Sequence, residues 1–189
     1  MRERTGIAVV GAGPCGLGVG IAARQAGVPC LIFDKGSLTD ALVRFPRNMT
    51  FFSTADRLEL GGVPFIVAGE KPSRVDALRY YRRVASHFDL DCRLYEEVVA
   101  ISGCAGDFTL YTRRPDGAGA EYGAEAVVVA TGYFDTPRLL GVPGEEMGKV
   151  RHYYDEGYPY YRQRCLVVGG GNSAVDAALD LYRSGADVT

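Results

Sequence analysis

Three glycines near the amino end of the chain have the spacing of a phosphate-binding turn. They form the pattern Gly11-x-Gly13-x-x-Gly16, directly after a β-branched apolar run over residues 7–10. In this pattern the glycines permit a tight turn, let a pyrophosphate approach the backbone, and let the following helix pack on the preceding strand. The free N–H groups and the positive end of the helix dipole then bind the phosphates. Because a strand is predicted before the pattern and a helix after it, the pattern indicates a dinucleotide site.

An acidic residue follows where such a site needs one. Asp34 comes directly after the apolar run 30–33, which we predict to be the second strand. An acid at this place can accept a hydrogen bond from the ribose of an adenosine. Strand, glycine turn, helix, strand and acid together predict the first part of a Rossmann-like unit.

A second turn of the same kind begins at Gly169. The pattern Gly169-x-Gly171-x-x-Ala174 follows a predicted strand over residues 165–168 and precedes a predicted helix over 175–183. Alanine in the third place is an accepted variant of the pattern. Two such turns predict two dinucleotides, one a tightly held flavin and the other a nicotinamide that delivers hydride to it.

Between the two turns, Thr131 and Gly132 follow an apolar segment over residues 126–130. An α/β sheet places its ligands outside the carboxyl ends of its strands, so these two residues are candidates for ligand contact. Their position alone is also compatible with an ordinary strand end.

The elements that must position these residues can be predicted from apolar spacing and capping signals. Pro14 suits the first turn of a helix that ends near Gly27, and Ser73 suits the N-cap of a helix that runs to about residue 87. That second helix should bury one side and expose an arginine face; its predicted buried residues are Val75, Leu78, Tyr81, Val84 and Ala85, and its predicted exposed residues are Arg79, Arg82 and Arg83.

Short strands are predicted over residues 93–95, 98–102 and 108–112, with no clear period from residue 36 to 54. The expected fold class is α/β, with a parallel Rossmann-like sheet and an antiparallel β excursion from about residue 93 to 122. The truncated start of a second Rossmann-like unit should follow. Its helix would have little sheet to cover its apolar side, which should leave Val175, Leu179 and Tyr182 exposed.

The charge composition favours a protein whose ligands are small molecules. The formal net charge is −2 and like charges do not form a long block, which gives no electrostatic case for nucleic acid or an acidic membrane surface. No segment approaches the ~20 apolar residues of a membrane span, so the cytoplasm is the expected location. His87 and His152 lack the spacing of metal ligands, so we predict no metal site. A homo-oligomer is left open.

The five cysteines are odd in number and none forms a Cys-x-x-Cys pair, which does not fit a secreted disulfide framework. Cys15 lies at the predicted start of a helix, where the dipole lowers the pKa of a thiol, while a bound pyrophosphate would act in the opposite direction. Cys15 can therefore be either a reactive thiol or a small residue that packs in the core. The remaining four are predicted to be buried small hydrophobes: Cys30, Cys92, Cys104 and Cys165.

The whole chain from about Gly6 onward resembles the bacillithiol-disulfide reductase family, within the flavoproteins related to thioredoxin reductase. The general order GxGxxG, ATG and GxGxxA carries the wider resemblance. Six stretches narrow it: residues 11–16 (GAGPCG), 44–54 (RFPRNMTFFST), 70–74 (EKPSR), 80–84 (YYRRV), 130–133 (ATGY) and 169–175 (GGGNSAV).

This resemblance implies an enzyme that passes hydride from NADPH through FAD to the disulfide of a low-molecular-weight thiol. The domains expected from it are an FAD-binding domain (1–150), a linker (151–163) and the incomplete start of an NAD(P)H-binding domain (164–189). Cys15 is the implied catalytic thiol. The residues implied to bind FAD are Gly11, Gly13, Pro14, Cys15, Gly16, Asp34, Lys35, Thr50, Val98, Thr131 and Gly132. Those implied for the second dinucleotide are Gly169, Gly171, Asn172, Ser173 and Ala174.

Two alternatives are kept. A flavin-dependent monooxygenase shares both turns, but its linking motif expects an aromatic residue where this chain has Glu146, ahead of Gly148 and His152. A flavin-binding module without turnover is the other. We expect the 189-residue chain to be a fragment with negligible NADPH oxidation by itself. The identity of the disulfide and the choice between NADPH and NADH stay open at this point.

Overall fold

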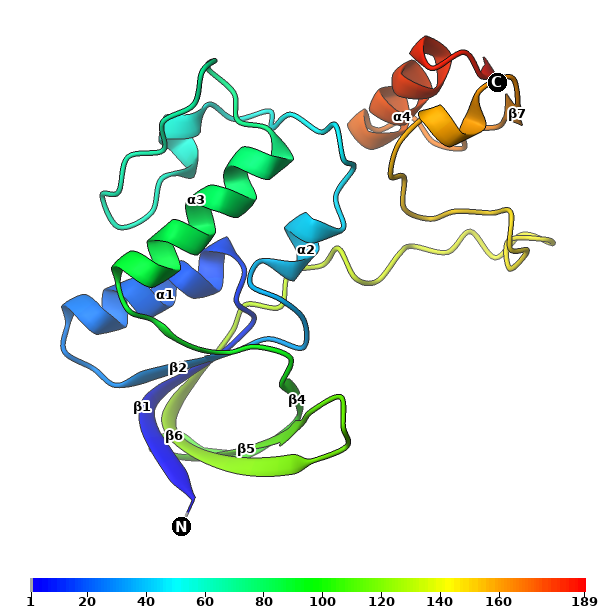
Figure 1. Cartoon of the computed structure of the whole chain (residues 1–189). Helices are drawn as coiled ribbons and strands as arrows, with labels where there is room; N and C mark the ends of the chain where they lie inside the picture. The colour runs from blue at the N-terminus through cyan, green and yellow to red at the C-terminus, as the bar shows by residue number, and fades with distance from the viewer. Residues whose placement is uncertain (1) are drawn as a thin grey trace. The chain divides into compact units, whose positions relative to one another are not determined.

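The structure is a computed structural model that describes residues 2–189 (Figure 1). These residues divide into two compact units. The first comprises residues 2–43 and 50–136, and the second comprises residues 44–49 and 137–189.

A six-stranded mixed sheet forms the centre of the first unit, with the order β3-β2-β1-β6-β5-β4. The strands are β1 (Glu3–Val10), β2 (Cys30–Phe33), β3 (Asp91–Arg93), β4 (Glu97–Cys104), β5 (Asp107–Arg113) and β6 (Gly119–Val129). Strands β3, β2, β1 and β6 run parallel, whereas β6, β5 and β4 form an antiparallel meander. The predicted Rossmann-like sheet with an antiparallel excursion is therefore confirmed.

Helix α1 (Pro14–Gln25) covers one face of β1 and β2 (Figure 1). Two glycines allow this close contact: a Cβ at Gly20 would lie 2.5 Å from Cδ1 of Ile32, and one at Gly16 would lie 3.3 Å from Cγ1 of Val9. The interval 36–54, for which the sequence predicted no element, contains the short helix α2 (Asp40–Val43).

Helix α3 (Arg74–His87) starts as predicted. Ser73 is its N-cap and forms a capping box with Asp76, whose backbone N–H donates to the Ser73 hydroxyl at 3.2 Å. A 3₁₀ turn, η1 (Ala55–Leu58), precedes it in the chain.

The predicted buried side of α3 was partly wrong. Val75 is exposed and Leu78 is half-buried, whereas Ala77 and Tyr80 are buried with Tyr81, Val84 and Ala85. The stripe is rotated toward residues 77 and 80 because the Tyr80 hydroxyl binds the backbone of the 60–63 segment, donating to Val63 O at 2.7 Å and accepting from Leu60 N at 2.7 Å. The exposed arginine face is confirmed for Arg79, Arg82 and Arg83.

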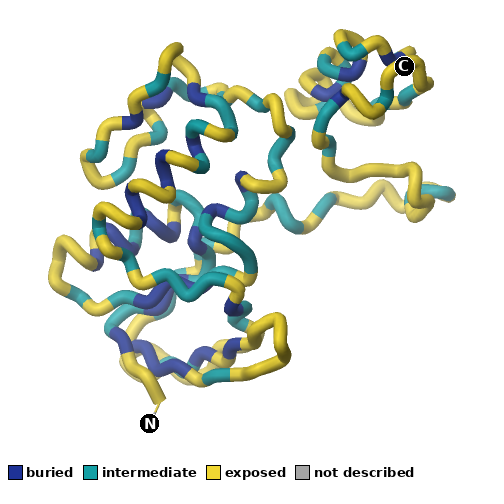
Figure 2. Tube along the Cα trace, in the orientation of Figure 1, coloured by how far each residue is buried: buried dark blue, intermediate teal, exposed yellow. Residues whose placement is uncertain are grey.

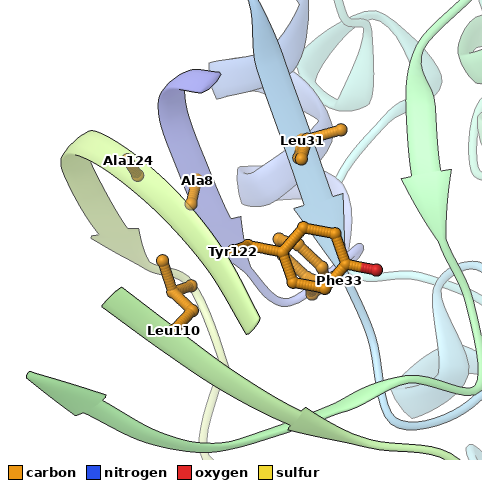
Figure 3. Packing of buried hydrophobic residues seen from close by; sticks show 6 residues of the cluster. All are labelled: Ala8, Leu31, Phe33, Leu110, Tyr122 and Ala124. Carbon is orange, nitrogen blue, oxygen red and sulfur yellow. The ribbon is translucent and has the colours of Figure 1, made fainter. Parts of the chain in front are cut away.

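The core between the parallel strands and the meander is a small cluster of apolar side chains that includes two aromatic rings (Figure 3). Its cluster consists of Ala8, Leu31, Phe33, Leu110, Tyr122 and Ala124. The rings of Phe33 and Tyr122 meet edge to face, with centroids 4.8 Å apart. Buried residues follow these strands and the facing sides of α1 and α3 (Figure 2). The core thereby fixes the carboxyl end of β2, which carries Asp34.

The second unit contains a strand-helix-strand arrangement. Strands β7 (Arg164–Cys165) and β8 (Asp187–Val188) pair in parallel, and α4 (Asn172–Arg183) connects them. A 3₁₀ turn, η2 (Tyr158–Tyr160), lies before β7. The strand predicted over residues 165–168 was too long. Strand β7 ends at Cys165, because β8 offers only two residues for pairing. The expected exposed side of α4 is confirmed, with Val175, Leu179 and Tyr182 exposed by 52%, 44% and 72%.

The prediction that four cysteines are buried was wrong for Cys104, which is exposed, and too strong for the other three, which are half-buried. Cys104 ends edge strand β4 and pairs with Asp107 at the β4–β5 turn, where little covers it. Burial, followed by the charge of Asp91, raises the pKa of Cys30 and raises that of Cys92 to about 11.

Among residues 2–189, none of the helices has the length and apolar character needed to cross a membrane.

Candidate dinucleotide sites

The first glycine turn lies at the carboxyl end of β1, between its two neighbouring strands. The backbone N–H of Gly11 donates to Phe33 O at 2.7 Å, and the N–H of Ala130 donates to Val10 O at 2.8 Å. Gly11 adopts φ +113°, a conformation that side chains disfavour. Hydrogen bonds therefore connect the ends of β1, β2 and β6 around the turn.

The space around each of the three positions explains in a different way why glycine occupies it. A Cβ at Gly11 would lie 2.3 Å from Ala130 O, and a Cβ at Gly16 would lie 1.8 Å from Gly11 O, so both positions exclude any side chain. At Gly13 a Cβ would meet no atom within 4 Å. The turn is thus closed toward the protein and open at Gly13, which fits a phosphate group approaching the backbone.

The amino end of α1 offers donors to such a group. Gly13 is the N-cap and Pro14 occupies the first turn, which contains no acidic residue. Within residues 2–189, no side chain caps this helix. The first N–H groups of a helix have no partner inside the helix, so this end can bind an anion through N–H donors and the dipole.

Asp34 is bound more tightly by the protein than the sequence indicated. Its Oδ2 accepts a hydrogen bond from Ala12 N at 2.8 Å, and its Oδ1 accepts one from Gly36 N at 2.9 Å. Ala12 O in turn accepts from Thr39 N at 3.0 Å. Each carboxylate oxygen retains a second lone pair, so Asp34 can hold the glycine turn and still accept from a ribose hydroxyl.

Lys35 points toward the segment after β6. Its Nζ lies 2.5 Å from Oδ2 of Asp135, an ion pair between partly exposed side chains. Lys35 also lines a cavity of about 410 Å³. The other residues that line it are Tyr95, Glu97, Arg113, Arg114, Pro115 and Gly117.

The remaining candidates of the first unit lie on separate segments. Thr131 and Gly132 are exposed just beyond β6, and Val98 is half-buried in β4 against the core cluster. Thr50 is exposed and forms an isolated antiparallel bridge with Ser73 at the start of α3. The structure thus groups the turn with Asp34, Lys35, Thr131 and Gly132 around the ends of β1, β2 and β6, whereas Thr50 belongs to another part of the unit.

Cys15 is exposed in the first turn of α1 and forms no disulfide. Tyr81 of α3 interacts electrostatically with it: burial, then Tyr80 and Cys15, raise the pKa of Tyr81 to about 12. Tyr81 is therefore a neutral phenol that donates a hydrogen bond to Leu58 O at 3.3 Å. The thiol is accessible to a reactant, as an exchange reaction would need.

The second glycine turn also leads into a helix that no side chain of residues 2–189 caps. Gly171 is the N-cap of α4, and no acidic residue occupies the first turn of the helix. Asn172 and Ser173 are exposed, and Ala174 is half-buried. A Cβ at Gly169 would lie 3.4 Å from the Ala174 Cβ, an ordinary contact. This end too can bind an anion through its backbone.

The sequence did not single out Glu96, the residue before β4. Its side chain is only 2% exposed. It accepts hydrogen bonds from Thr112 in β5 and from Arg114, which directly follows β5. A lone glutamate between Tyr95 and Glu97 carries no spacing signal, because its partners lie 16 and 18 residues away.

Within the described residues 2–189, no group of three or more His, Cys, Asp or Glu side chains could hold a metal ion.

A sheet whose parallel strands end at a glycine turn hydrogen-bonded to Asp34, followed by a second turn of the same kind, has the features of a Rossmann-like dinucleotide-binding fold. The chain belongs to the pyridine nucleotide-disulphide oxidoreductase family, whose sequence model matches residues 8–189. It is 40% identical over 182 residues to bacilliredoxin reductase Bdr of Bacillus subtilis (strain 168), covering 96% of this chain and 55% of the relative. The expected resemblance to bacillithiol-disulfide reductases is thereby confirmed.

A solved structure supports the same relationship. Bacillithiol disulfide reductase Bdr (YpdA) from Bacillus cereus superposes with a TM-score of 0.95 at 41% identity, covering 98% of this chain and 57% of that one. More distant is the probable indole-3-pyruvate monooxygenase YUCCA1 of Arabidopsis thaliana, 31% identical over 94% of this chain and 44% of the relative. The chain spans about half the length of the curated relatives it matches.

Proposed function

We propose that this chain provides the FAD site and the phosphate turn of the NADPH site in an NADPH-driven reductase of a low-molecular-weight thiol disulfide, of the bacillithiol disulfide type. The observation that carries this proposal is the first glycine turn. It is closed to side chains at Gly11 and Gly16, open at Gly13, and tied to Asp34 by a hydrogen bond of 2.8 Å. The similarity to Bdr proteins supports the substrate class.

The residues of the first turn fit the pyrophosphate of FAD. The backbone of Gly13 to Gly16 would bind the phosphates, and Asp34 with Lys35 would hold the adenosine ribose. Val98 would contact the adenine, while Thr131, Gly132 and, more weakly, Thr50 would lie near the flavin ring. Bound FAD would supply a ring that accepts hydride.

NADPH is the proposed ligand of the second turn. The free amino end of α4 would bind its phosphates through the backbone of the turn and the first helical residues. The residues proposed for this role are Gly169, Gly171, Asn172, Ser173 and Ala174.

Cys15 is the proposed reactive thiol. Its thiolate would attack one sulfur of the substrate disulfide, which breaks the sulfur–sulfur bond, forms a mixed disulfide at Cys15 and releases one thiolate. Exposure of Cys15 and its position at the amino end of α1, beside the proposed phosphate site, support this role, since a disulfide can reach the thiol.

The domain limits and location are also proposals. We infer an FAD-binding domain over residues 1–150, a linker over 151–163 and the start of an NAD(P)H-binding domain over 164–189. A cytoplasmic location fits the dependence of such an enzyme on NADPH and thiols.

A two-part experiment tests the proposal on the chain itself. FAD added to the FAD-free protein should bind, which its absorbance after removal of free FAD would record. Bacillithiol disulfide should then add one bacillithiol to Cys15, detected by mass spectrometry and absent in Cys15→Ser. Cys104→Ser is the control, because Cys104 is also exposed. A protein without flavin bands after reconstitution would contradict the FAD site, and modification at Cys104 alone would contradict the role of Cys15.

A flavin-dependent monooxygenase is the second candidate, favoured by the similarity to YUCCA1. Glu146 stands where the linking motif of that class expects an aromatic residue. In addition, His152 lies with its Nδ1 3.9 Å from Oε1 of Glu145, so its neighbour is a carboxylate. NADPH-dependent oxygenation of a substrate would favour the monooxygenase.

A further inference from the structure

Glu96 is a buried charged residue to which the proposed function assigns no task. Its Oε1 accepts a hydrogen bond from Oγ1 of Thr112 at 2.7 Å. Its Oε2 accepts from Nε and Nη2 of Arg114 at 3.1 and 3.0 Å. The hydroxyl of Tyr122 also hydrogen-bonds to the carboxylate. These partners lie on β5, directly after β5, and on β6.

The partners keep Glu96 ionised. Burial acts to raise the pKa of Glu96, but the hydrogen bonds from Thr112, Tyr122 and Arg114 and the charge of Arg114 hold it below its usual value. Burying a carboxylate without such partners is strongly unfavourable, so these donors are what allows the charge to be buried here. If one partner were lost, the buried carboxylate of Glu96 would lack one of its hydrogen bonds.

The backbone around Glu96 is bound to the segment that carries Asp34. Asp34 N donates to Arg93 O at 3.1 Å, and Asp34 O accepts from Glu96 N at 2.8 Å. Tyr95 N donates to Gly36 O at 3.0 Å, and Tyr95 adopts φ +57°, a conformation unusual for a residue with a side chain. Three hydrogen bonds thus attach residues 93–96 to residues 34–36.

Glu96 therefore stands between two parts of the proposed adenosine site. Asp34 follows β2 and Val98 belongs to β4, and these strands are at different positions in the sheet. The Glu96 backbone binds Asp34 directly, and Val98 is two residues further along the chain. The Glu96 side chain anchors this connection to the meander, whose Tyr122 ring also packs on Phe33, the residue before Asp34.

From this arrangement we infer that Glu96 is a positioning residue for the adenosine half of the dinucleotide: its anchored carboxylate holds Asp34 and Val98 at the separation that an adenosine requires. The inference rests on the proposed FAD site. Glu96 does not touch the ligand in this role, and it acts through the backbone of Asp34 and through the start of β4.

The test compares Glu96→Gln with Glu121→Gln. The first replaces one carboxylate oxygen by an N–H₂ group that faces the donors of Thr112 or Arg114. The second makes the same chemical change at an exposed site in β6, one residue before Tyr122. Dissociation constants of FAD and of ADP are measured on the FAD-free proteins by calorimetry, together with the unfolding midpoints in the absence of ligand. ADP carries the adenosine and the pyrophosphate but no flavin.

We expect Glu96→Gln to raise the dissociation constants of FAD and ADP by the same factor, about tenfold, because the misplaced groups contact only the adenosine half. Glu121→Gln should leave both constants unchanged. A purely structural role would lower the unfolding midpoint of Glu96→Gln and leave both constants as in the wild type, which would overturn the inference. A weaker FAD affinity with an unchanged ADP affinity would also overturn it.

Thr112→Val provides a second variant in case Glu96→Gln does not fold. It removes a single donor at nearly constant volume, and it should raise both constants in parallel by a smaller factor. If the wild-type protein binds neither FAD nor ADP, the proposed FAD site fails. If the wild type binds both and neither variant differs from it, only the role of Glu96 fails.

Discussion

The two glycine turns share one pattern but differ in their surroundings. At the first turn, Gly11 is enclosed by the ends of β2 and β6, and Asp34 binds the backbone of Ala12. At the second turn, Gly170 and Gly171 have no atom within 4 Å of a virtual Cβ, and β7 is only two residues long. Both turns place a helix end that can bind an anion. Only at the first turn does a residue at the end of a neighbouring strand, Ala130 after β6, leave no room for a side chain, and it does so at Gly11.

The largest expected effect comes from closing the first turn. Gly11→Ala should destabilise the first unit by about 2–4 kcal/mol and weaken FAD by at least about 100-fold, because the methyl group meets Ala130 O and φ is positive. Gly171→Ala should change the free energy of unfolding by less than about 0.5 kcal/mol, since φ is −83° and the position is open. Urea denaturation and FAD titration measure both. Equal effects at the two positions would refute the comparison.

The thiol beside the first glycine turn, Cys15, should react faster than the strand thiol Cys92. Cys15 is exposed, whereas Cys92 is half-buried with a pKa raised to about 11. Since only the thiolate reacts, Cys92 should be alkylated by iodoacetamide about 100-fold or more slowly than Cys15 at neutral pH. The rate at Cys92 should rise about tenfold per pH unit until the pH reaches that pKa. Mass spectrometry of alkylated peptides gives the rates, and a pH-independent rate at Cys92 would contradict the prediction.

A substitution of Asp34, which is bound to the first turn, should have an intermediate effect on FAD affinity. Asp34→Ala removes the acceptors of Ala12 N and Gly36 N, and should weaken FAD by about 1–3 kcal/mol. Asp187→Ala, an exposed acid of β8 in the second unit, is the matched control and should leave FAD affinity unchanged. Fluorescence titration with FAD decides between them. An unchanged affinity in Asp34→Ala would remove Asp34 from the proposed site.

The smallest expected effect concerns the second unit. The Tyr154 hydroxyl donates to Oδ2 of Asp180 in α4, and that oxygen also accepts from Gly157 N at 3.1 Å. Burial and the Asp180 contact raise the pKa of Tyr154. Tyr154→Phe should lower the free energy of local unfolding of α4 by about 1 kcal/mol, measured by hydrogen exchange. Tyr158→Phe, whose ring is mostly exposed, should have no effect. Slower exchange in Tyr154→Phe would be inconsistent with this contact.

Local patterns were sufficient for much of the fold. The capping signal at Ser73 predicted the start of α3 correctly, and the glycine turn predicted the junction of β1 and α1. Both depend on residues within a few positions of one another, where helix capping and backbone sterics act. Predictions that required a neighbour from elsewhere were weaker: Cys104 is exposed at a sheet edge, and the buried side of α3 is set by Tyr80 and the 60–63 segment.

The sequence alone determined that two glycine turns with the dinucleotide pattern exist, that an acid follows the first, and to which family the chain belongs. Only the tertiary structure decided what Asp34 and Lys35 bind within the protein, and only it brought Glu96 together with Thr112, Arg114 and Tyr122. The physical reason is range. A turn or a helix end depends on adjacent backbone geometry, whereas a buried carboxylate is stable only beside donors that a distant part of the chain supplies.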